Sequence, residues 1–124
     1  MAQKLKSVMV NSTVCDGTFT LAPKWLEIDV ASGLSLNGPL VIDYDEIGKF
    51  NARWGYVNTL TAQVAPQMAA FCRQSHDVKG QPCFGLTLYP MLNMIFNSDS
   101  ERNAFIKDLE GLVKKAGYPD FKIL

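Results

Sequence analysis

The chain has 124 residues, of which 48% are hydrophobic and 19% charged, with twelve basic and twelve acidic side chains. This length predicts a single domain over residues 1–124, and the composition excludes a disordered chain, a collagen-like chain and a coiled-coil rod. A net charge of zero argues against a nucleic-acid-binding protein, which usually carries a basic excess, and against electrostatic adhesion to an anionic membrane.

The N-terminal residues and the cysteines predict a cytoplasmic protein. Lys4 and Lys6 precede a short apolar stretch that Asn11 interrupts, whereas a secretory signal needs roughly 7–15 apolar residues in a row. No run approaches the ~18 apolar residues of a membrane-spanning helix. The chain has three cysteines, and an odd number does not make a disulfide framework, so we expect reduced thiols.

The first half of the chain alternates apolar and polar residues with period two, as strands with one buried face do. A first strand is expected over residues 4–14, with Val8, Val10 and Val14 on one face. A turn at residues 15–17 follows, because the Asp-Gly pair there readily adopts positive backbone φ. Further strands are expected at residues 18–21, 25–30 and 40–44.

The second half predicts a hairpin that brings two cysteines together. Segments 68–73 and 83–89 are expected to pair antiparallel around a turn centred between residues 77 and 78. Pairing about that point places Cys72 opposite Cys83, with Cα atoms about 4.5–5.5 Å apart and therefore within disulfide range. A last alternating run leads from this hairpin to residue 97.

Residues 99–116 predict one amphipathic helix. Apolar residues recur at helical spacing from Phe105 to Val113. Ser98 stands three residues before Glu101, which fits a capping box at the start of a helix. A glycine and a proline just beyond the last turn end the pattern.

These elements predict an α+β fold that is mostly antiparallel β. About seven strands over residues 4–97 are expected to curl into a small barrel, and the C-terminal helix is expected to cover its open end.

The layout resembles the pleckstrin-homology-like (PH-like) superfamily, in particular its short bacterial members. The similarity lies in residues 17–21 turning into 25–29, in the acidic-Ile step that ends residues 40–47, and in residues 93–96 running into the helix. The resemblance implies a PH-like barrel that acts as a binding module for phosphoinositides, peptides or proteins, and not as an enzyme. Lipid-binding members carry basic residues around the first hairpin, whereas residues 11–17 here contain none.

Few residues carry the patterns that catalysis needs. His76 is the only histidine and stands next to Asp77, but it lies in a turn segment and is read as a solvated residue rather than a general base. Cys72 is read as a buried thiol rather than a nucleophile. The acidic residues at 43–46 lack the pattern of a calcium loop and are read as a solvated edge. We therefore expect no metal site and no cofactor.

Aromatic and arginine side chains suggest a surface for a partner. Arg53, Trp54 and Tyr56 are of the types enriched in binding hot spots, and no clean strand pattern accounts for them. Trp25 is expected to point outward, on the face that carries Glu27. The alternative for the two aromatic residues at 54 and 56 is that they fill the core.

The sequence thus favours a non-enzymatic binding domain that engages a protein partner, of adaptor, immunity or inhibitor type. One alternative is a peripheral lipid- or anion-binding PH-like module that uses Lys4, Lys6 and Lys24. A second alternative is a small enzyme that uses His76 or Cys72. No nucleic-acid partner and no membrane association are expected, and self-association is left open.

Overall fold

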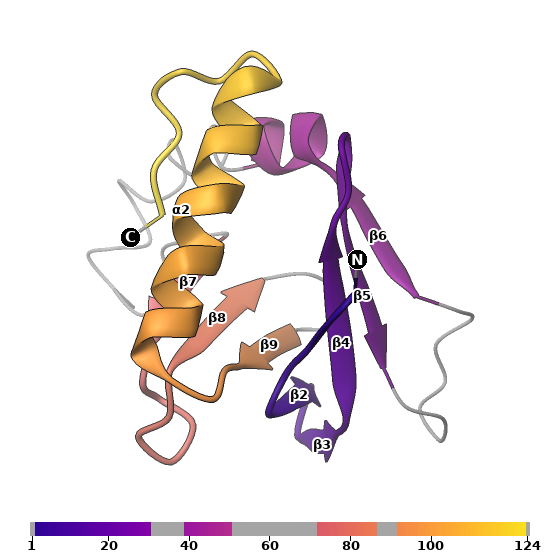
Figure 1. Ribbon diagram of the computed structural model, residues 1–124, viewed down its shortest axis with the longest axis vertical. Helices are drawn as coiled ribbons and strands as arrows, with labels where there is room; N and C mark the ends of the chain where they lie inside the picture. The colour runs from indigo at the N-terminus through magenta and orange to yellow at the C-terminus, as the bar shows by residue number, and fades with distance from the viewer. Residues whose placement is uncertain (1, 31–38, 51–71, 87–91, 124) are drawn as a thin grey trace.

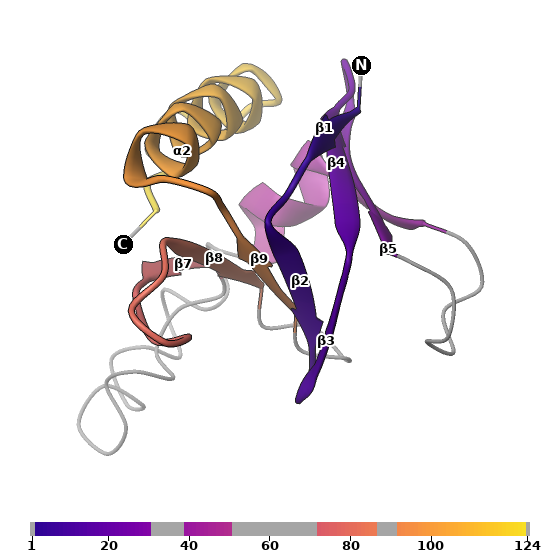
Figure 2. The same cartoon turned by 60° about the horizontal axis from the view of Figure 1, so that its bottom comes forward.

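A computed structural model describes residues 2–30, 39–50, 72–86 and 92–123. Within these ranges two antiparallel sheets meet at an angle, and the long helix α2 (Asp99–Lys115) lies in that angle (Figures 1 and 2). A shorter helical segment covers residues 44–50. The α+β class and the dominance of antiparallel β structure are as expected.

Across the described residues the two sheets contain nine strands, rather than the about seven expected, and they do not close into a barrel. The first sheet has the order β1-β4-β5-β6 and contains β1 (Gln3–Lys4), β4 (Gly17–Leu21), β5 (Trp25–Val30) and β6 (Leu40–Asp43). The second has the order β3-β2-β9-β8-β7 and contains β3 (Thr13–Cys15), β2 (Ser7–Val10), β9 (Leu92–Ile95), β8 (Cys83–Leu86) and β7 (Cys72–Ser75).

The single strand expected over residues 4–14 is wrong. Asn11 has a φ of 54° and turns the chain between β2 and β3. Val8 and Val10 are buried, but Val14 is 58% exposed, because the turn places it on the outer face of the next strand. The turn expected at residues 15–17 does not reverse the chain, because residue 16 only separates β3 from β4.

This first hairpin is bent, so that its two arms take part in both sheets. Val8 pairs with Cys15 in the second sheet, and Lys4 pairs with Thr18 in the first. Between these pairs the first arm has one residue more than the second, which makes a bulge at residues 5 and 6. The Leu5 N–H donates to Gly17 O at 3.0 Å and the Lys6 N–H to Ile95 O at 3.0 Å, so hydrogen bonding passes from one sheet to the other. Bulges of this kind bend strands at the corners of packed sheets.

Gly17 stands at the bend of the hairpin, close to Val8 of the second sheet and Asp29 of the first. It begins β4 in extended conformation, without the positive φ that the Asp-Gly pair suggested. A Cβ atom at this position would collide with the Val8 side chain and lie 3.0 Å from Asp29 O. Glycine is therefore needed here for space.

The hairpin of β7 and β8 exists, but its expected register is wrong. Cys72 pairs with Leu86, and Cys83 pairs with Ser75. The chain reverses around residue 79, later than the expected point between residues 77 and 78. Lys79 and Gly80 both have positive φ in this turn, at 53° and 72°. The two cysteines are therefore three positions apart, about 10 Å along the strands. Both thiols are free and buried.

Helix α2 confirms the expected element, and Ala116 is its C-cap. The Ser98 hydroxyl accepts a hydrogen bond from the Glu101 N–H at 3.1 Å, which satisfies a free donor of the first turn. Gly117 follows with a φ of 116°. Beyond it, a tail that the sequence patterns did not reveal returns alongside α2 and buries Phe121 and Ile123 (Figure 1).

The core lies between α2 and the inner faces of both sheets, and Phe105 is at its centre. The Phe105 ring lies 5.0 Å from the ring of Phe19 in β4 and 5.1 Å from that of Phe84 in β8, both in edge-on geometry. Phe96, just after β9, lies 5.3 Å from it. One helical side chain thus contacts both sheets.

Phe105→Ala should lower the free energy of unfolding by roughly 3–5 kcal/mol, because it removes a buried ring and leaves a cavity. Lys107→Ala, on the exposed side of the same helix turn, should change it by less than about 0.5 kcal/mol. Urea unfolding of both variants measures the difference. If Phe105→Ala lowered the free energy of unfolding by no more than Lys107→Ala does, the ring would not have the central place in the core that we give it.

Gly17→Ala should destabilise the protein by roughly 1–3 kcal/mol, because the new methyl group overpacks the corner between the sheets. A second change, Val8→Ala, makes room for that methyl group. The two changes together should therefore cost less than the sum of their separate costs. A double-mutant cycle by urea unfolding tests this. If the two costs simply added, a clash between residue 17 and the Val8 side chain would not explain the loss of stability.

Candidate binding cleft

Three segments far apart in the sequence meet at one end of the molecule (top of Figure 1) and enclose a cleft of about 710 Å³. The cleft is lined by residues 23–25 of the turn between β4 and β5 and by residues 43–45, where β6 passes into the short helical segment. Leu112, Lys115 and Ala116 at the end of α2 complete the lining.

Tyr44 ties two of these segments together. Its backbone N–H donates to Lys24 O at 3.1 Å, and its hydroxyl donates to Ala22 O at 2.6 Å. Only 2% of the side chain surface is exposed, and burial raises the pKa of the phenol to about 12. Tyr44 was expected to end a strand, but it opens the helical segment instead. The turn between β4 and β5 is therefore held in place by side-chain and backbone bonds.

Trp25 is the exposed aromatic residue of the cleft. It begins β5, a strand with the expected bounds, in which Leu26 and Ile28 are fully buried and Trp25 points to the opposite face. The side chain is 37% exposed and faces Asp43 across the strand pair. The outward direction expected for this residue is thus confirmed. Leu112, half-buried on α2, adds a second large apolar side chain to the lining.

The charged residues of the cleft differ in whether they have partners. Asp45 lies 2.9 Å from Lys49 Nζ and accepts a hydrogen bond from the Tyr118 hydroxyl at 2.9 Å. These two contacts hold the pKa of the Asp45 carboxyl below its usual value. Lys24, Lys115 and Asp43 are exposed, and their side chains form no ion pair with any other described residue.

The acidic residues at 43–46 are exposed at 43, 45 and 46, as expected of a solvated edge. No group of three or more His, Cys, Asp or Glu side chains suited to a metal ion occurs in the described part of the chain.

Of the residues expected to bind a partner, Trp25 lines this cleft. Arg53, Trp54 and Tyr56 lie outside the residues that the structure describes. Of the three lysines considered for an anion site, only Lys24 lines the cleft. Lys4 lines a separate cleft between β1, β4 and α2, and Lys6 is an exposed residue of the bulge.

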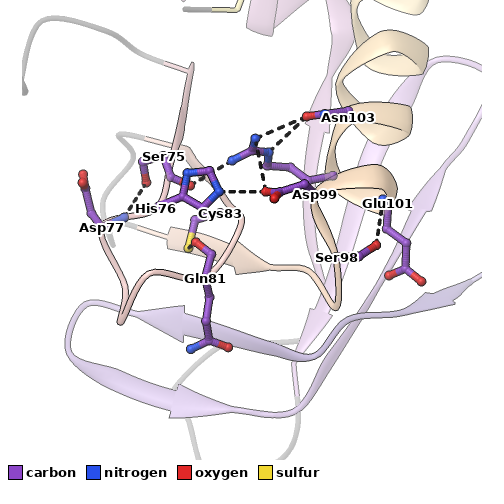
Figure 3. Close-up of polar contacts among 10 residues, drawn as sticks. Ser75, His76, Asp77, Gln81, Cys83, Ser98, Asp99, Glu101 and Asn103 are labelled. Carbon is purple, nitrogen blue, oxygen red and sulfur yellow. Dashed lines mark hydrogen bonds and ion pairs between the residues drawn. The ribbon is translucent and has the colours of Figure 1, made fainter.

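His76 belongs to a polar cluster that fastens the β7–β8 turn to the start of α2 (Figure 3). Its Nε2 atom lies 2.7 Å from Asp99 Oδ1, so the partner is Asp99 and not the neighbouring Asp77. Arg102 is buried, and its Nη1 donates to Ser75 O at 3.0 Å. The histidine is exposed, as expected, but it has a partner. The cluster therefore joins the β7–β8 hairpin to the start of α2.

The cysteines on the two strands of this hairpin are buried, and burial raises the pKa of both thiols. Cys72 is 1% exposed, and the thiol of Cys83 donates to Gln81 O at 3.2 Å. A nucleophilic cysteine needs a lowered pKa and an accessible sulfur. Both thiols have the surroundings of structural residues.

Comparison with protein-family models, with curated proteins and with solved structures found no match for this chain. Among the described residues, no helix has both the length and the apolar character needed to cross a membrane.

Tyr44→Phe should change how stability depends on alkaline pH. The pKa of Tyr44 is raised to about 12 in the folded protein, whereas a tyrosine in an unfolded chain titrates near 10. The folded state therefore holds the phenol proton more tightly than the unfolded state does. The stability that results is fully present below about pH 10 and is lost as the pH rises towards 12. Urea midpoints measured across this range should fall more steeply for the wild type than for the variant. Equal slopes would contradict this account.

Proposed function

We propose that this protein is a small, non-enzymatic binding domain of PH-like type that engages a protein partner through the cleft around Trp25. The observation that carries the proposal is the partly exposed indole, which lines a cleft of about 710 Å³ together with Leu112. An adaptor, immunity or inhibitor role in the cytoplasm is part of the same proposal.

The composition of the cleft supports a binding role. Tryptophan is enriched among the residues that dominate binding energy, and such residues work best in pockets that exclude water. The volume falls within the roughly 300–1,000 Å³ of ligand sites. Lys24, Lys115 and Asp43, which have no ion-pair partner among the described residues, supply the polar rim that protein interfaces have around an apolar centre.

The alternatives have less support. A lipid or anion site that uses Lys4, Lys6 and Lys24 needs these cations close together, but Lys4 and Lys24 line different clefts. An enzyme that uses Cys72 or His76 needs an accessible thiol or a base that faces a pocket. Cys72 is buried, and His76 is engaged with Asp99. The two antiparallel sheets with a helix between them are compatible with a PH-like domain.

Trp25→Ala should abolish partner binding without unfolding the domain. Wild-type protein, the Trp25 variant and Val14→Ala would each be immobilised and exposed to an extract of the cells that express the protein. Val14 is a matched control, because it is another exposed apolar residue but lies on the second sheet.

A partner captured by the wild type would be purified and its Kd measured for each variant. We expect a loss of at least about 2 kcal/mol, or roughly thirtyfold, for Trp25→Ala, and little change for Val14→Ala. Circular dichroism checks that both variants fold. Equal affinity of the wild type and the folded Trp25 variant would refute the proposed function.

A further inference from the structure

The geometry points to the kind of partner segment that the cleft accepts. We propose that it is a short acidic peptide segment, with a bulky apolar side chain that packs on Trp25 and flanking carboxylates that pair with Lys24 and Lys115. This inference rests on the proposed function and adds the chemistry of the ligand to it.

The unpaired charges of the cleft, counted over the described residues, are unequal in sign. Lys24 comes from the β4–β5 turn and Lys115 from the last turn of α2, so two separate elements bring one cation each to the same cleft. The negative charge of Asp45 is already compensated by Lys49 and the Tyr118 hydroxyl. Among the described residues, the charged side chains of the cleft without an ion-pair partner are the two lysines and Asp43. These unpaired groups carry one net positive charge, although the net charge of the whole chain is zero.

The apolar contact with the ligand is expected at Trp25. Trp25 and Asp43 face each other across the β5–β6 pair, so a carboxylate placed directly on the indole would be repelled by Asp43. An apolar side chain meets no such penalty there, and Leu112 lines the same cleft. The acidic groups of the ligand are therefore expected on either side of the apolar residue.

Size and geometry favour a peptide over a lipid headgroup. A cleft of about 710 Å³ matches a drug-sized ligand or a few side chains of an extended segment. A phosphorylated headgroup is best held by cations that converge on it. The lysines here come from different elements and share the cleft with a large indole, which a headgroup would not use.

The experiment is a selection of short random-sequence peptides displayed on phage, made against the wild-type protein. The Kd of the selected peptides is then measured for the wild type, Trp25→Ala, the double variant Lys24→Glu/Lys115→Glu and the control Lys114→Glu. Lys114 is exposed in the same helical turn as Lys115 but does not line the cleft.

We expect the selected peptides to carry acidic residues on both sides of an aromatic or large aliphatic residue. The double variant should weaken their binding by about tenfold or more, and Lys114→Glu by no more than about twofold. Added salt should weaken binding to the wild type, because exposed charge pairs are screened. Should the double variant fail to fold, the corresponding alanine variants make the same comparison.

The outcomes separate this inference from the proposed function. Selected peptides that need Trp25 but are neutral or basic, or that bind the folded double variant equally well, would overturn the acidic-peptide inference alone. Selected peptides that do not need Trp25, or no enrichment at all, would overturn both. Co-sedimentation with vesicles of phosphatidylcholine and phosphatidylserine adds a further arm. Vesicle binding that is lost in the double variant, without peptide enrichment, would assign the lysines to lipid instead.

Discussion

The edge-on contact of Phe105 with Phe19 and Phe84 holds the two halves of this protein together. Each sheet has one apolar face, and across the described residues the sheets do not close on each other, so each needs a cover. The stripe on α2 covers both, because its central ring contacts one strand from each sheet. Aromatic pairs in this geometry contribute about 0.5–1.5 kcal/mol beyond the burial of their area. The position of α2, and with it the position of its C-terminal end, follows from this contact.

The angle between the sheets is set by the bent first hairpin. The bulge at Leu5 and Lys6 directs successive N–H groups to different sheets, and Gly17 allows the close approach at the corner. If the hairpin were straight, one helix could not contact both inner faces. The same angle brings the end of α2 near the β4–β5 turn. The hydrogen bond from Tyr118 to Asp45 connects the chain beyond α2 with the helical segment at 44–50.

The cleft at this end has properties that neither the composition nor any single element possesses. The chain as a whole is neutral, yet Lys24 and Lys115 both line the cleft, in which Asp45 is paired with Lys49. Trp25 is exposed on the outer face of β5, and the bonds of Tyr44 hold the turn beside it. Because the turn is held by hydrogen bonds, fewer groups beside Trp25 have to be ordered when a ligand binds.

By itself, the sequence determined the elements whose signals are local. The bounds of β5, the outward direction of Trp25 and the Ser98 cap of α2 follow from periodicity and capping within a few residues. The register of Cys72 against Cys83, the bend of the first hairpin and the meeting of Trp25 with Lys115 were decided only by the tertiary structure. Leu112 shows the difference, because helical spacing assigns it to an apolar stripe while packing leaves it half-buried beside Trp25. Periodicity reports which face of an element is apolar, but register and clefts depend on contacts between residues distant in the chain, and local patterns do not encode these.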